Sequence, residues 1–309
     1  MGTSLRDRLA AAPITWGVCE VPQWGHQLTV HEVLSDMEAF GFARTEMGPF
    51  GFLPTGGSAL ASTLDRYGLS LLGGFVALVV HDPERLRVEM DRAEAIAAQM
   101  AEAGAAWFIS CPISDHDDWQ RPPLSAQQWN QMVEAFSQLD KIATAHGLSH
   151  AFHPHFGALI QDDAETCFLL ENTATQLVLD TAHLTLGGSD PRALVDTHAE
   201  RIGLVHLKDV DAAVAARLHR GEISLMIAVQ LGLFPPLGQG AVPLGDLIET
   251  LETVRPDLWY VLEQDAALDG PDPAEVERLR DRVTTSLEFV QDCGNSPHPP
   301  RGVQDSAST

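Results

Sequence analysis

The chain has 309 residues, and its 43 Asp and Glu against 19 Lys and Arg give a formal charge of −24. This length suits one large α/β barrel or two ordinary domains, and a hydrophobic content of 45% is enough for a sizeable core and excludes wholesale disorder. So acidic a surface repels phosphate backbones and anionic lipid, which argues against nucleic acids and membranes as partners.

The cysteines and the first residues bear on the compartment. Cys19, Cys111, Cys167 and Cys293 are widely scattered and form no CxxC pair, which is typical of reduced thiols. Residues 1–13 lack the long apolar stretch of a signal peptide, and no apolar run reaches membrane-spanning length. We therefore expect a soluble cytoplasmic enzyme that acts on a small neutral or metal-bound substrate.

Apolar, β-branched runs recur along the chain, and helical patterns lie between most of them. The predicted strands span residues 14–20, 42–48, 69–79, 105–112, 148–155, 176–183, 202–209 and 258–265. Alternating strands and helices over this length predict a single-domain (β/α)₈ TIM barrel. A doubly wound sheet is the alternative, but no GxGxxG follows the first predicted strand.

The helices between the strands have recognisable ends. A helix is predicted over 29–41, where Thr29 is an N-cap and Gly41 stops the helix. Further helices are predicted over 82–104, 125–147 and 272–292, and residues 218–254 contain a second short helix and a Gly/Pro loop. We expect the barrel domain to span 10–293 and the polar, proline-bearing tail 294–309 to be disordered.

Polar side chains follow the apolar runs directly at the predicted strand ends, which in a TIM barrel meet at the catalytic mouth. Charged groups placed there are costly to bury unless they are paired, and a divalent metal is the simplest partner. Carboxylate and imidazole ligands suit Zn²⁺, Mn²⁺, Co²⁺ or Fe²⁺. The strand-end residues are Glu20, Glu46, His153, His155, Asp180, His183, His206, Lys208, Asp209, Glu263, Gln264 and Asp265.

Several of these residues also have a purely structural interpretation. Asp180 or Glu263 alone can cap a helix or face solvent, and His206 alone can be a core histidine. His153 and His155, two apart on a strand, point to the same side and can simply brace the mouth. The ends of four consecutive strands taken together favour a metal site.

Four other residues near the predicted mouth are more ambiguous. Asp209 and Asp265 are interpreted as loop or cap residues rather than ligands. Lys208 can hold an anion or a hydroxyl, although exposed lysines are common. Trp16 can form a wall of the pocket or pack in the barrel.

The motifs together identify a family. The segments ITWGVCEVPQWG, TEMGPFGFLPTG, HPHFG, LDTAHL, VHLKDV and LEQD resemble the xylose-isomerase-like TIM barrels of the sugar phosphate isomerase/epimerase superfamily, over about residues 12–290. Within it they are most similar to the inosose dehydratases, which dehydrate 2-keto-myo-inositol. One departure is GQG at 238–240, where the dehydratases often show GDG.

The resemblance implies a divalent metal, above all Mn²⁺ or Co²⁺, with Zn²⁺, Fe²⁺ and Mg²⁺ as further candidates. Asp180, His206 and Glu263 match the metal positions by motif. The fourth position usually carries Glu in the superfamily, and here it carries His153, as dehydratase-like members also tend to do. Because imidazole replaces a carboxylate, the site is more positive by one unit of charge, and the metal becomes a stronger Lewis acid.

The implied activity is metal-dependent dehydration of a keto-cyclitol through an enediolate. Glu46, His155 and His183 are the candidates for base and acid, with Lys208 as a further catalytic residue. Substrate contacts are expected from Trp16, Glu20, His155, His183, Lys208 and Asp209. Dimers and tetramers are frequent among these barrels, so a homo-oligomer stays open.

Two other functions fit the same pattern. A divalent-metal sugar isomerase or 3-epimerase shares the metal and the enediolate chemistry but retains the hydroxyl. A non-catalytic sugar-binding barrel keeps the pocket without needing every ligand. AP endonucleases belong to the same superfamily, but a charge of −24 argues against a DNA substrate.

Overall fold

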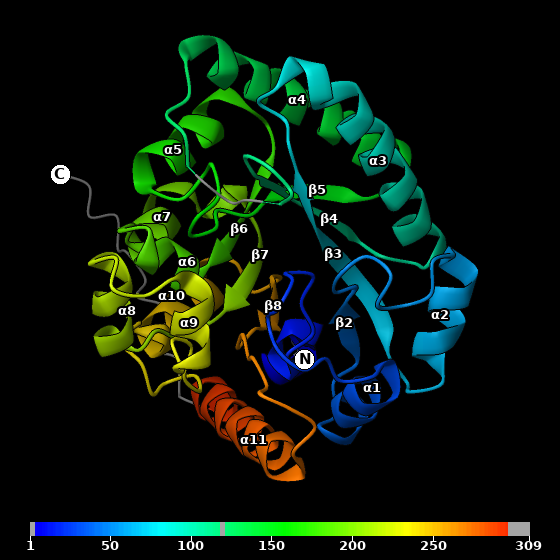
Figure 1. Cartoon of the computed structure of the whole chain (residues 1–309), viewed down its shortest axis with the longest axis vertical. Helices are drawn as coiled ribbons and strands as arrows, with labels where there is room; N and C mark the ends of the chain where they lie inside the picture. Colours follow the sequence, from blue (N-terminus) through cyan, green and yellow to red (C-terminus); the bar gives the residue numbers. More distant parts are fainter. Residues whose placement is uncertain (1–3, 118–120, 296–309) are drawn as a thin grey trace, which may run out of the picture.

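The strands close into a parallel barrel, and helices form a ring around it (Figure 1). The computed structural model describes residues 4–117 and 121–295. Neighbouring strands pair in chain order, and β8 returns to β1, so the predicted single-domain (β/α)₈ barrel is confirmed. The strands are β1 (Leu9–Ala11), β2 (Arg44–Glu46), β3 (Ser70–Leu78), β4 (Trp107–Pro112), β5 (Ser149–Phe152), β6 (Gln176–Asp180), β7 (Ile202–Leu207) and β8 (Trp259–Leu262).

Most predicted helices are present, and several begin at side-chain caps. Thr29 and Glu32 form a capping box at the start of the first helix, as expected from Thr29. The helices are α1 (Val30–Ala39), α2 (Gly57–Asp65), α3 (Pro83–Glu102), α4 (Ala126–Ala145), α5 (Asp163–Asn172), α6 (Thr181–Leu186), α7 (Pro191–His198), α8 (Ala212–His219), α9 (Leu225–Gln230), α10 (Leu244–Val254) and α11 (Pro273–Asn295). Three 3₁₀ turns, η1 (Arg6–Arg8), η2 (Pro13–Trp16) and η3 (Ala199–Arg201), complete the described elements.

Two further sequence predictions concern the C-terminal tail and the absence of a membrane-spanning segment. The expected disordered tail 294–309 lies outside the described residues from 296 onward, and residues 294–295 belong to the last turn of α11. Among the helices of the described part of the chain, none is both long enough and apolar enough to span a bilayer.

The prediction for the first strand was wrong. Residues 14–20 contain no strand, because the chain there forms η2 and then turns at Gly17, whose φ is 78°. Pro13 starts this 3₁₀ turn, since its ring fixes φ and it has no N–H to offer a sheet ladder. The first strand is instead the short β1, which pairs with β8 and, through Ala11, with β2.

Inside the barrel lies a layer of small and branched side chains, which we call the packing layer. Side chains alternate along a strand, so the residue two positions further along faces inward again, one layer nearer the mouth. On β4, β5, β6, β7 and β8 this second residue is Cys111, His153, Asp180, His206 and Glu263, respectively. The packing layer consists of Ala10, Ala12, Leu72, Ile109, Ala151, Val178, Leu204 and Val261, all buried.

Glycine bulges in β3 and β7 shift this alternation. On β3, Thr45 pairs with Leu71 but Glu46 pairs with Gly73, so one extra residue is inserted. On β7, Leu177 pairs with Ile202 but Val178 pairs with Leu204, so Gly203 is the extra residue. A Cβ atom would lie 2.6 Å from the Trp107 carbonyl oxygen at Gly73, and 2.6 Å from the Trp107 ring at Gly203. Only glycine fits at either place.

Candidate active site and metal centre

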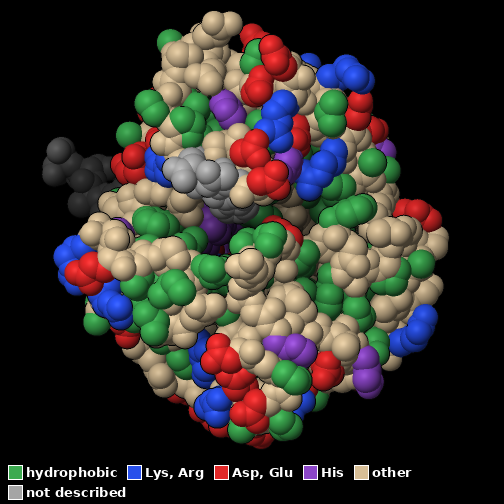
Figure 2. Space-filling view, viewed as in Figure 1, with side chains coloured by type: hydrophobic (Ala, Val, Ile, Leu, Met, Phe, Trp, Pro, Cys, Tyr) green, Lys and Arg blue, Asp and Glu red, His purple; other side chains and the backbone are tan. Residues whose placement is uncertain are grey.

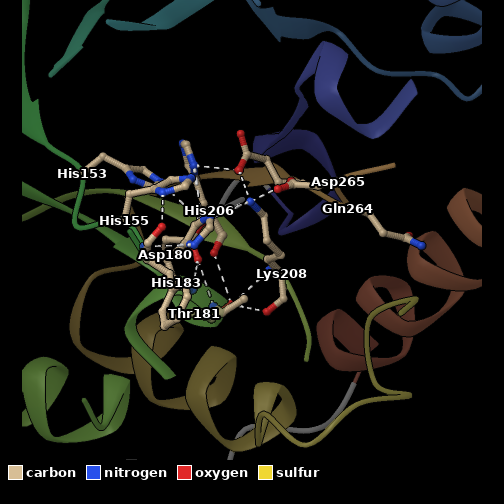
Figure 3. Close-up of polar contacts among 12 residues, drawn as sticks. His153, His155, Asp180, Thr181, His183, His206, Lys208, Gln264 and Asp265 are labelled. Carbon is tan, nitrogen blue, oxygen red and sulfur yellow. Dashed lines mark hydrogen bonds and ion pairs between the residues drawn. The ribbon is translucent and has the colours of Figure 1, made fainter. Parts of the chain in front are cut away.

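Four predicted metal ligands come together at the mouth of the barrel. They are His153 just after β5, Asp180 at the end of β6, His206 on β7 and Glu263 just after β8. One ligand atom from each lies within 4.8 Å of the others, and all four side chains are buried. Figure 3 shows His153, Asp180 and His206 converging from separate strands. The group could hold a metal ion.

Unsatisfied polar atoms inside this group fit a cation. Asp180 Oδ2 and His206 Nδ1 are buried and make no hydrogen bond in the described part of the chain. Asp180 Oδ2 lies 3.3 Å from His153 Nε2, and His206 Nδ1 lies 3.3 Å from Glu263 Oε2. A buried polar atom left without a partner costs about 1–3 kcal/mol, and a divalent ion among these donors removes that cost.

The two oxygens of Asp180 have different partners. Oδ1 accepts the backbone N–H groups of Ala182 and His183, at 2.9 and 2.7 Å, and so caps α6. The predicted strand 176–183 therefore ends at Asp180, and His183 lies on a helix. Burial alone would raise the pKa of Asp180, but Lys208 and His153 hold it below its usual value.

Glu46 fixes the orientation of His206. Its carboxylate lies 3.0 Å from His206 Nε2, on the far side of the imidazole from Nδ1. Burial would lower the pKa of His206, but Glu263 and Glu46 raise it well above the usual value. With Nε2 donating to Glu46, a metal that displaces the proton from Nδ1 would bind at that nitrogen, the arrangement common to metal-binding histidines. Glu46 is thus engaged with a histidine rather than turned into open space.

Lys208 lies among the buried carboxylates of this site. Its Nζ lies 2.9 Å from Glu263, 2.8 Å from Asp265 and 3.2 Å from His183 Nε2. Phe234 covers it from another side, with Nζ 5.0 Å from the ring centroid. Burial would lower the pKa of Lys208, but Asp265 and Glu263 raise it, so the amine stays charged.

Asp265 belongs to the site, although the sequence favoured a loop or cap role for it. Burial raises its pKa despite the attraction of Lys208. The available signal was its spacing, since Asp265 is two residues after Glu263 and shares its side of the chain. Gln264 between them points away in Figure 3 and contacts Ser286, 3.2 Å away.

His155 and His183 pack against each other beside the metal group, with ring centroids 3.7 Å apart and the rings tilted by 32°. Burial lowers the pKa of His155 to about 3, helped by His153 and Lys208. Burial also lowers the pKa of His183 well below its usual value, with His155 adding to the effect. His155 Nδ1 lies 2.9 Å from the carbonyl oxygen of Phe156, to which it donates, so Nε2 keeps its lone pair. Burial therefore favours the neutral form of both rings.

Three other predicted substrate contacts lie apart from this cluster. Asp209 is buried, and its carboxylate accepts backbone N–H groups from the loop that contains the GQG segment. Trp16 is buried against α1, where its Nε1 donates to Asp36 at 3.2 Å. Glu20 is exposed, and it is near enough to add to the raised pKa that burial gives the Cys111 thiol.

The opposite side of the mouth is apolar. Phe75, Ala77 and Val79 from β3 and its following turn form a cluster with Cys111, Ile113 and Ala158. We call this cluster the apolar half, and the group of His153, His155, Asp180, His183, His206, Lys208, Glu263 and Asp265 the ionic half. The Phe75 ring meets His153 edge-on at a centroid distance of 5.5 Å, so the two halves touch. Figure 2 shows a hollow near the centre of one face, with histidine side chains at its base.

Comparisons with known proteins agree with the fold. Residues 34–282 match the family described as xylose isomerase-like TIM barrel. An inosose dehydratase of Geobacillus kaustophilus is 30% identical over 279 residues, which is 85% of this chain and 90% of the relative. The rhizopine catabolism protein MocC of Rhizobium meliloti is 31% identical over 265 residues, covering 83% of this chain and 81% of MocC.

A solved structure has the same architecture. The IolI protein with a bound zinc atom superposes with a TM-score of 0.67 over 93% of this chain and 97% of IolI, at 15% identity. At that identity the similarity shows the fold alone. The match over residues 34–282 and the relatives near 30% identity show more, and the chain belongs to the xylose isomerase-like TIM barrel family.

Proposed function

We propose that this protein is a metal-dependent lyase that dehydrates a keto-cyclitol such as 2-keto-myo-inositol through an enediolate. One observation carries the proposal: four ligand-type side chains lie within 4.8 Å of one another at the ends of consecutive strands, β5 to β8. The relatives named inosose dehydratase, at 27–30% identity over most of both chains, support the substrate class.

His153, Asp180, His206 and Glu263 are the proposed metal ligands. Two imidazoles and two carboxylates suit Mn²⁺ or Co²⁺, our proposed metals, and the zinc atom in the IolI structure supports a divalent ion. When bound, such an ion supplies the Lewis acidity that removal of a proton next to a carbonyl requires. Glu46 holds the tautomer of His206 and is therefore a positioning residue in this proposal rather than the base.

His155 and His183 are the proposed proton carriers. One of these closely packed rings accepts the proton next to the carbonyl and becomes an imidazolium, and this proton then passes to the departing hydroxyl, which leaves as water. Lys208 is proposed to hold a substrate oxygen with its charged amine. Asp209 is proposed to position the loop above the site, since its carboxylate is occupied by backbone amides.

A small polyol or keto-sugar is the proposed partner, in the cytoplasm, and the charge of −24 supports the exclusion of nucleic acid. The test is to strip the purified protein of metal, add Mn²⁺ or Co²⁺ and 2-keto-myo-inositol, and follow the mass of the product. A metal-dependent loss of one water is the expected result.

Two other outcomes separate the alternatives. An unchanged mass with a new isomer assigns the isomerase or 3-epimerase function in place of the lyase. Failure to bind metal, together with no reaction, removes the proposal and leaves a sugar-binding barrel. The metal-stripped protein without added ion is the control for each measurement.

A further inference from the structure

The direction of Phe75 depends on the bulge in β3. Leu72 lies in the packing layer, and strict alternation would next turn Gly74 and Val76 inward. Instead Val76 and Leu78 lie in the outer core under the helices, while Phe75 packs on the interior clusters. The extra residue opposite Glu46 therefore turns Phe75 into the mouth. Bulges beside active sites commonly redirect a side chain in this way.

Phe75 joins the apolar half to the site. Its ring contacts His153 edge-on and lies 6.2 Å from the His155 ring centroid. Phe75 and Ala77 stay partly exposed although they point into the barrel, so the described residues leave part of this side of the mouth open. Among the described residues, a substrate bound to the ionic half therefore meets on its other side a cluster whose side chains are apolar except for the Cys111 thiol.

We propose that the apolar half binds the C–H face of a six-membered polyol ring, and that Phe75 selects such a ring over an open-chain ketose. This inference rests on the proposed function and names the shape of its substrate. Equatorial hydroxyls leave a polyol ring around its edge, so its faces present C–H groups. Those C–H groups suit the electron-rich face of an aromatic ring.

An open-chain ketose does not separate C–H faces from hydroxyl groups in this way. Its hydroxyls point in all directions, so a chain held against the apolar half buries some of them without partners. Each such hydroxyl costs about 1–3 kcal/mol, and the ring avoids this cost by keeping its hydroxyls toward the ionic half and the solvent. Discrimination thus comes from the apolar wall, while the ionic half binds the carbonyl end of either compound.

The experiment compares a ring with a short ketose on the metal-loaded, full-length protein. Dissociation constants are measured by calorimetry for myo-inositol, and for L-erythrulose, which is too short to cyclise. Phe75→Leu should weaken myo-inositol binding about tenfold, the usual size of one lost apolar contact, and change erythrulose binding less than about twofold. Phe75→Tyr keeps the aromatic face and should restore ring binding to within about twofold of the wild type.

Phe108→Leu is the matched control, because Phe108 is buried on the neighbouring strand but faces outward against His150. It should lower the melting temperature without changing either dissociation constant. Equal weakening of ring and chain by Phe75→Leu, or equal effects of the Phe75 and Phe108 substitutions, would overturn the inference. So would a wild-type protein that binds neither compound.

The same proteins distinguish this inference from the proposed function. If 2-keto-myo-inositol is not dehydrated but myo-inositol binding still depends on Phe75, the lyase proposal fails and the ring preference stands. If dehydration occurs with a KM that Phe75→Leu leaves unchanged, the lyase proposal stands and the ring preference fails.

Discussion

The ionic and apolar halves of the barrel mouth rest on one packing layer. Each lies beside a strand with a bulge, β7 or β3, at which a glycine packs against Trp107. They differ in the residue that stands above that layer. On β5 to β8 it is His153, Asp180, His206 or Glu263, whereas on β3 and β4 it is Phe75 or Cys111. The ionic half buries carboxylates together with Lys208 and His206, and its four ligand-type residues could hold a metal ion, whereas the apolar half buries no charged group. The two proposals therefore assign chemistry and recognition to different strands.

Removing a ligand from the ionic half should have the largest effect. Asp180→Asn keeps an oxygen that can cap α6 but loses the charge, so the fold should persist while the metal is lost. Activity should fall at least about a thousandfold, since the Lewis acid contributes several kcal/mol. Metal content by mass spectrometry and the rate of water loss are measured together. Full metal occupancy in both Asp180→Ala and Glu263→Ala would refute the site.

Within the ionic half, a residue outside the ligand set should separate turnover from metal binding. His155→Gln should retain the metal and lower kcat by about 10²–10⁴, the usual contribution of a general acid or base. The measurement is steady-state kinetics at saturating metal, with metal content determined on the same sample. A variant with normal kcat would remove His155 from the proton-transfer steps.

The contact behind His206 should have a smaller effect. Glu46→Gln weakens the hydrogen bond that fixes the His206 ring, so metal affinity should fall about 10–100-fold while kcat at saturating metal changes little. Competition with a fluorescent chelator gives the affinity. A large loss of kcat with unchanged affinity would instead restore Glu46 as a base.

The smallest effect concerns the seam between the halves, on the outer face of β4 and β5. His150 is buried there, 2.7 Å from the Ser110 hydroxyl and 2.6 Å from Asp140. His150→Gln should lower the free energy of unfolding by about 1–3 kcal/mol at pH 7, because these buried hydrogen bonds are disturbed. Metal affinity and kcat should stay near wild type if the seam stabilises both halves without taking part in either function.

The pH dependence of this seam has a definite sign. Burial lowers the pKa of His150, with Asp140 opposing the shift, so the unfolded chain binds the proton more tightly than the native state. The stability from neutral His150 is complete above its unfolded pKa of about 6.5 and is lost as the pH falls through the lower native pKa. The stability difference between wild type and His150→Gln should therefore narrow from pH 7 to pH 5. A constant difference in urea titrations would contradict this.

The two halves were not equally visible in the sequence. The ionic half was predictable because charged residues directly after apolar runs, as in LVLD and YVLE, have few explanations other than a shared partner. The direction of the Phe75 side chain was not predictable, because the alternation within LLGGFVALV cannot show where the register shifts. The short β1 was missed for a related reason, since Leu9–Ala11 has no β-branched residue and draws its stability from β8.

The roles of two residues depend on tertiary contacts that local sequence patterns cannot predict. The sequence suggested a loop role for Asp209 and also a substrate contact, and only the folded loop shows its carboxylate occupied by amides of Gly238, Gly240 and Val242. Asp265 depended on the position of Lys208, which no spacing along the chain reveals.

Asp180 caps α6 and is also a proposed metal ligand, and these two roles together constrain how the site can change over evolutionary time. Its side chain must be short enough to cap α6 and anionic enough to hold a cation, so neither Glu nor Asn satisfies both requirements. His153 carries no such second obligation, since its Nδ1 makes no hydrogen bond in the described chain. Lineages of this barrel can therefore exchange imidazole for carboxylate at the end of β5, and retune the metal, while the aspartate at the end of β6 stays unchanged.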